Sequence, residues 1–164
     1  VGSGVMIGLP GQTVDDLVHD LRFFEEFDLD MIGMGPYIPH ADTPLGHGIE
    51  VTEEYRRRQL EAGLRMIACT RLLLRDVNIA STTALQALGD DWRELGLLAG
   101  GNVVMPNITE TGYRKGYQLY EGKPALEASS AESRDNLSRR IASIGETIRW
   151  AESGDSLHYA ARHR

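Results

Sequence analysis

The stretch Gly4-Val-Met-Ile-Gly-Leu-Pro-Gly-Gln-Thr13 gives the strongest indication of how this chain folds. An apolar run stops at Pro-Gly-Gln-Thr and an amphipathic segment follows at once, which predicts a strand over 4–9, a turn, and a helix over 14–27. Thr13 is a suitable N-cap, with Asp16 as its partner in a capping box. Because a helix N-terminus offers unpaired N–H groups and partial positive charge, the turn is a candidate site for an anion or a carboxylate.

The same strand-then-helix order recurs three more times. We expect strands over 31–35, 78–83 and 102–105, and helices over 52–74, 92–99 and from about 134 to 152. Such alternation predicts an α/β fold with a parallel sheet. It fits either a self-contained four-stranded open sheet or half of an eight-unit barrel of about 250 residues. The unit at Gly4 begins close to the start of the chain, which favours half a barrel over 1–152, followed by a frayed tail over 153–164.

Composition narrows the class of function. The 164 residues carry a net charge of −7, which argues against binding to nucleic acid or to an anionic membrane surface. No segment approaches the roughly 20 apolar residues of a membrane span, and we expect no signal peptide. The single cysteine, Cys69, cannot form an internal disulfide or a cysteine-bound metal site by itself, which favours a cytoplasmic setting. Its place in the middle of a helix predicts inert core.

Chemistry in parallel α/β folds belongs at the carboxyl ends of the strands. After the first strand, Gly8, Pro10 and Gly11 let the backbone approach a ligand and Gln12 adds an amide, although a plain tight turn explains them equally well. His40, after the second strand, is more typical of a structural hydrogen-bonding residue than of a proton donor or a metal ligand.

The third and fourth strands end in further candidates. Thr82 and Thr83 could hold a carboxylate or reflect strand propensity alone, and Met105 could line a pocket or fill the core. Tyr113, Arg114, Tyr117 and Tyr120 could form a cavity wall or the surface of a short helix. The residues alone thus indicate a small polar ligand at the strand ends, with no recognisable catalytic set and no metal-ligand cluster.

Five segments carry a resemblance to a known family. They are 3–17 with Met-Ile-Gly-Leu-Pro-Gly-Gln-Thr, 30–45 with Gly-Pro-Tyr-Ile-Pro-His-Ala-Asp-Thr-Pro, 78–84, 101–107 and 113–123. In this order they resemble radical S-adenosylmethionine (SAM) enzymes, in the branch that holds the HydE family of FeFe-hydrogenase maturases, biotin synthase and methylornithine synthase. The resemblance runs from about Gly4 to Lys123.

The resemblance implies that the chain is the C-terminal half of a radical SAM (β/α)8 barrel, comprising strands five to eight with their helices. In that family a 4Fe-4S cluster reduces SAM to supply a 5′-deoxyadenosyl radical, which the maturases use in assembling the di-iron subcluster of the hydrogenase. The implied SAM-binding residues are Gly8, Pro10, Gly11, Gln12, Met31 and Ile38. The implied lining of the cavity for a small-molecule substrate is Thr82, Thr83, Met105, Tyr117 and Tyr120.

The family's cluster motif, Cys-x-x-x-Cys-x-x-Cys, is absent here, so the cluster ligands lie outside this chain and we expect the chain alone to be inactive. The expected partners are the missing N-terminal half of the barrel and other hydrogenase maturation proteins. Two alternatives stay open: a methylornithine synthase or biotin-synthase-like enzyme, and, in another class, a non-catalytic α/β module that binds a small anion.

Overall fold

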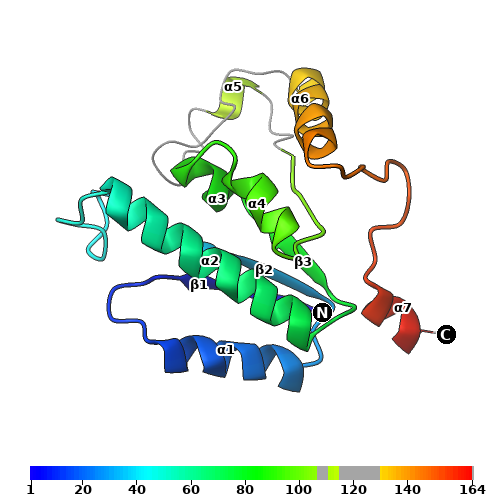
Figure 1. The fold of residues 1–164 in the computed structure, drawn as a ribbon, viewed down its shortest axis with the longest axis horizontal. Coiled ribbons are helices and arrows are strands. Elements are labelled where there is room, and N and C mark those ends of the chain that lie inside the picture. Colours follow the sequence, from blue (N-terminus) through cyan, green and yellow to red (C-terminus); the bar gives the residue numbers. More distant parts are fainter. Residues whose placement is uncertain (107–110, 115–129, 164) are drawn as a thin grey trace.

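A three-stranded parallel sheet lies at the centre of the structure, a computed structural model that describes residues 1–106, 111–114 and 130–163. Its strands are β1 (Gly2–Ile7), β2 (Met31–Pro36) and β3 (Asn78–Ser81), in the order β1-β2-β3 (Figure 1). The register pairs Gly2 with Met31 and Ile7 with Pro36, and Met31 with Asn78. The predicted α/β class and the predicted parallel sheet are therefore confirmed.

The predicted fourth strand over 102–105 is reduced to one parallel bridge between Ala80 and Val103. The Val103 carbonyl accepts a hydrogen bond from the Ser81 N–H at 2.9 Å, so this segment does lie beside β3. Pro106 follows soon after and has no N–H to donate, which works against a longer ladder.

Seven helices are found in the described part of the chain. Their bounds are α1 Val14–Glu26, α2 Glu53–Leu73, α3 Thr83–Leu88, α4 Trp92–Leu98, α5 Thr111–Arg114, α6 Ser130–Ser143 and α7 Leu157–Arg162. The capping box at the start of α1 is present as predicted, since the Asp16 N–H donates to the Thr13 hydroxyl and the Asp16 carboxylate accepts from the Thr13 N–H. None of these described helices is long and apolar enough to cross a membrane.

The core lies between one face of the sheet and the helices, and α2 crosses in front of the strands in Figure 1. Ile7, Ile32, Met34 and Ile79 bury their side chains there, together with Phe24 of α1. Alternation along the strands turns their neighbours to the opposite face. That face is open at Met6, which is 55% exposed, and at Gly33, where an added side chain would meet nothing within 4 Å.

Three predictions about local structure are wrong. The strand predicted to reach Thr83 stops at Ser81, because Thr82 becomes the N-cap of α3, whose sequence Thr-Ala-Leu-Gln-Ala-Leu contains good helix formers. The last long helix stops at Ser143 rather than about 152. Gly145, at φ 82°, donates to the Ala142 carbonyl and Glu146 donates to the Ile141 carbonyl, which is a Schellman C-cap.

The third correction concerns Cys69, which is exposed rather than part of the core. The buried face of α2 is made by Gln59, Gly63, Met66, Ile67 and Thr70, and Cys69 lies off this stripe. Where the sequence indicated a frayed tail, the structure has α7, capped by Ser156, whose hydroxyl accepts from the Tyr159 N–H at 3.0 Å.

Candidate functional site

The turn after β1 is held by the side chain of Gln12. Its Oε1 accepts hydrogen bonds from the N–H groups of Gly8 at 2.7 Å and Leu9 at 3.3 Å, and its Nε2 donates to the Met6 carbonyl at 3.1 Å. The amide that the sequence offered as a ligand contact is thus engaged by the turn itself. Gln12 shapes the backbone at the end of β1.

A second glutamine, which the sequence reasoning missed, supports the same turn from α2. Gln59 is 4% exposed, and its Nε2 donates to the Gly8 carbonyl at 3.0 Å. Gly8 has φ +79°, a left-handed conformation that favours glycine. A Cβ added there would lie 2.1 Å from the Gln59 Oε1, so the Gln59 amide would have to shift. In the sequence, the indication of this role is that Gln59 lies at helical spacing from Gly63, Met66 and Ile67, which are buried on the same face of α2.

The loop after β2 is fixed to the same helix. The Tyr37 N–H donates to the Ile7 carbonyl at 2.8 Å, and the Tyr55 hydroxyl donates to the Tyr37 carbonyl at 2.9 Å. Burial raises the pKa of Tyr55 above its ordinary value, so its hydroxyl keeps its proton and stays a donor. Ile38 follows directly in this loop.

A cleft of about 390 Å³ opens beside the first turn, between α1 and α2. Its volume lies within the range of roughly 300–1,000 Å³ that is usual for small-molecule pockets. Residues 8–14, Leu17, Ile49, Tyr55, Arg58, Gln59 and Ala62 line it. Four predicted SAM-binding residues therefore border this cleft: Gly8, Pro10, Gly11 and Gln12.

The other two predicted SAM-binding residues do not line the cleft. Ile38 lies past the carboxyl end of β2, while Met31 begins β2 and pairs with Gly2. Five residue-to-residue steps of extended strand, about 16 Å, separate Met31 from Pro36 at the opposite end. The structure thus brings the two strand-end loops together and leaves Met31 apart from them.

The predicted substrate residues fall at the end of β3 and beyond. The Thr82 hydroxyl donates to the Met34 carbonyl at 3.1 Å, where the ladder between β2 and β3 ends, and Thr83 opens α3. A Cβ at Gly35 would lie 2.4 Å from the Thr82 Oγ1, so glycine permits this close approach. Met105 is 50% exposed, and Tyr117 and Tyr120 lie outside the described residues.

His40, in the loop after β2, makes a local hydrogen bond. The His40 Nδ1 accepts from the Asp42 N–H at 3.2 Å, in keeping with the predicted structural role. Among the residues that the structure describes, no group of three or more His, Cys, Asp or Glu side chains could hold a metal ion.

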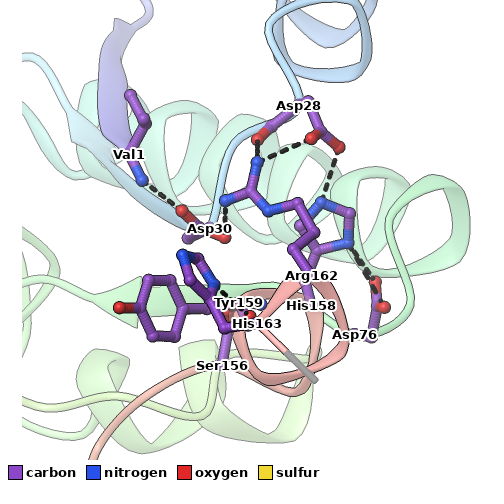
Figure 2. A network of polar contacts seen from close by, with 9 residues as sticks. All are labelled: Val1, Asp28, Asp30, Asp76, Ser156, His158, Tyr159, Arg162 and His163. Atoms are coloured by element: carbon purple, nitrogen blue, oxygen red, sulfur yellow. Dashed lines mark hydrogen bonds and ion pairs between the residues drawn. The ribbon is translucent and has the colours of Figure 1, made fainter.

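A polar cluster that no sequence pattern predicts lies at the amino ends of β2 and β3 (Figure 2). The His158 Nε2 lies 2.6 Å from the Asp28 Oδ1 and its Nδ1 lies 3.3 Å from Asp76, while Arg162 pairs with Asp28 at 2.6 Å and also with Asp30. These bonds attach α7 to loops more than 80 residues away in sequence. The cluster anchors the C-terminal helix, at the end of the sheet away from the cleft.

No protein-family model matches the chain. The FeFe-hydrogenase maturase subunit HydE of Thermotoga maritima is 50% identical to it over 122 residues, which cover 74% of this chain and 33% of that protein. The chain thus spans about a third of the length of the curated relative that it matches. The resemblance found in the sequence is confirmed, and the chain is similar to a HydE-like segment of a radical SAM enzyme.

Proposed function

We propose that this chain forms strands five to eight, with their helices, of a radical SAM barrel of the HydE type. The observation that carries the proposal is the 50% identity to the maturase subunit HydE. The sheet topology supports it, because β1, β2, β3 and the Val103 bridge follow one another in chain order. Barrels have this sequential order, whereas doubly wound sheets reverse their strand order at a switch point.

The loops after β1 and β2 are the proposed SAM-binding walls, and the geometry there is compatible with such a ligand. At Gly11, in the loop after β1, an added Cβ would meet nothing within 4 Å, so a ligand could approach the backbone there. The same space is open at Gly33, inside β2. The turn 8–12 and the backbone near Ile38 would hold the cofactor, and Gln12 would act by fixing the turn. When bound with the cluster, SAM supplies a 5′-deoxyadenosyl radical, and the barrel wall protects it from side reactions.

For the substrate we propose a small amino-acid-like or anionic molecule in the barrel cavity. Thr82, Thr83, Met105, Tyr117 and Tyr120 would line that cavity. The Thr82 hydroxyl donates to the Met34 carbonyl, so toward a ligand it can still act as an acceptor. The product would enter the assembly of the di-iron subcluster, together with other hydrogenase maturation proteins.

The cluster ligands would come from the remainder of the barrel, since this chain has one cysteine. The test is anaerobic assay of the complete barrel, with its cluster reconstituted, for 5′-deoxyadenosine released from SAM under a strong reductant. We expect release by the complete protein and none by these 164 residues alone. A complete, cluster-loaded protein that binds SAM without cleaving it would contradict the proposal. Turnover of a methylornithine synthase or biotin synthase substrate would move the assignment to those relatives.

A further inference from the structure

We propose that Tyr55 and Gln59, one turn apart on α2, are positioning residues that set the loops after β1 and β2 at the separation that SAM requires. This inference rests on the proposed function and extends it to a helix that the resemblance did not implicate. Residues four apart lie on the same face of a helix, so the two side chains reach the sheet edge together.

Hydrogen bonds connect both loops to α2. Gln59 donates to the Gly8 carbonyl at 3.0 Å, and Tyr55 donates to the Tyr37 carbonyl at 2.9 Å. The Tyr37 N–H in turn donates to the Ile7 carbonyl at 2.8 Å, which joins the first residue after β2 to the last residue of β1. One rigid helix therefore holds a carbonyl from each of the two loops that carry the proposed cofactor-binding residues.

The burial of Gln59 argues that its hydrogen bond is the reason for its presence. Its Oε1 is buried and finds no hydrogen-bond partner in the described part of the chain, which is unfavourable. A methionine of similar size would fill the same space without that penalty. What methionine lacks is the donor to Gly8, the residue whose positive φ sets the direction of the turn.

Both donors are used by backbone carbonyls, so these side chains act through the loops and not as direct ligands. Displacement of a binding loop by a fraction of an ångström is enough to weaken affinity, because the contacts depend on tight geometry. Loss of either donor should therefore raise the dissociation constant for SAM more than general destabilisation does.

The experiment uses the complete barrel and the variants Tyr55→Phe and Gln59→Met, with the dissociation constant for SAM measured by equilibrium dialysis. Tyr159→Phe and Gln86→Met are matched controls on α7 and α3, and Ile67→Val is a buried control on α2. The free energy of unfolding is measured for every variant. We expect the two test variants to raise the dissociation constant roughly three- to tenfold. We also expect faster amide exchange at Gly8 and Leu9 in Gln59→Met, and controls within about twofold of the parent protein for binding.

Two outcomes would overturn the inference. In the first, the parent protein binds SAM and the test variants either bind it as tightly or lose affinity only in proportion to their loss of stability, as Ile67→Val does. The positioning role is then wrong and the proposed function stands. If the complete parent protein with its cluster binds no SAM, the proposed function falls and takes this inference with it.

Discussion

Gly8 is the residue where the constraints on the proposed site converge. It has a positive φ, its N–H is held by Gln12, its carbonyl is held by Gln59, and the space for a side chain is filled. Gly11, three residues on, has nearly the same φ of +80° but open space around it. Substitutions at the two glycines therefore distinguish the cost of backbone strain from the cost of steric overlap within one turn.

We predict that Gly8→Ala destabilises the protein more than Gly11→Ala. Both changes cost about 1–2 kcal/mol because alanine disfavours a left-handed backbone. Gly8→Ala adds an overlap with Gln59 that costs about 1–3 kcal/mol more. Urea unfolding of the two variants measures the difference. Equal losses of stability would mean that Gln59 can move aside and that the Gln59 amide is not packed tightly against Gly8.

The position of this turn could be predicted from the sequence, whereas the hydrogen bonds that hold it could not. The strand, the turn and the capping box of Thr13 and Asp16 follow from neighbouring residues, and these were predictable. The supporting role of Gln59 depends on a contact between residues 51 apart, which no local pattern reveals. The engagement of Gln12 by the Gly8, Leu9 and Met6 backbone depends on how the turn folds back, so a local pattern does not reveal it either.

Helix α7 is docked by charged groups, so its attachment should depend on pH. Burial alone lowers the pKa of His158, but hydrogen bonds to the Asp28 and Asp76 carboxylates outweigh it and raise that pKa above its ordinary value of 6.5. The stabilisation from protonated His158 is therefore complete below pH 6.5 and is lost as pH rises through the raised pKa. Hydrogen bonds from His158 and Arg162 lower the pKa of Asp28 below 3.8, so its contribution is lost only under more acidic conditions.

We predict that His158→Asn destabilises the protein at about pH 5.5 and has a smaller effect at about pH 8.5, where the parent imidazole is less protonated. Urea unfolding at both values measures this, with His19→Asn on the exposed side of α1 as the matched control. An effect of His158→Asn that is the same at both pH values would contradict docking by a charged imidazole, whose contacts are drawn in Figure 2.

Helix α6 is joined to α4 by a bidentate ion pair between Arg140 and Glu94. The Arg140 Nε and Nη2 lie 2.5 and 2.6 Å from the two carboxylate oxygens of Glu94, whose side chain is 7% exposed. Arg140→Leu would leave that carboxylate buried without this partner. We predict a loss of about 2–4 kcal/mol, because Arg140 itself is 22% exposed and solvent weakens the pair.

The neighbouring exposed residue offers the control for this pair. Arg139→Leu changes the same charge on the same helix without touching Glu94, and we predict a change within about 0.5 kcal/mol. Chemical unfolding of both variants provides the comparison. A loss in Arg140→Leu no larger than in Arg139→Leu would show that the pair does not hold α6 in place.

The bounds of α1 and α2 could be predicted from the sequence, whereas α3, the end of α6 and α7 could not. α1 and α2 begin at their threonine caps, and the sequence placed both ends within two residues. Two threonines in a row are also typical of a strand end, which obscures the start of α3 at Thr83, and Gly145 is a local indication that α6 ends at Ser143. α7 depends on ion pairs with the distant Asp28, Asp30 and Asp76, which the sequence of the helix does not reveal.

The sheet as a whole is covered by helices on one face and open at Met6 and Gly33 on the other. The outer edge of β1 has no strand beside it within the residues described. Open edges and uncovered sheet faces promote association, so we predict that these 164 residues alone form concentration-dependent oligomers, measured by analytical ultracentrifugation. A monodisperse monomer that unfolds cooperatively would favour the self-contained binding module instead.

Sequencing of the gene upstream of the Val1 codon tests most directly whether this chain is part of a radical SAM barrel. We predict an in-frame extension of roughly 150–200 residues, enough to complete an eight-unit barrel, that contains Cys-x-x-x-Cys-x-x-Cys. A start codon immediately before Val1, or an extension without the three cysteines, would contradict the assignment.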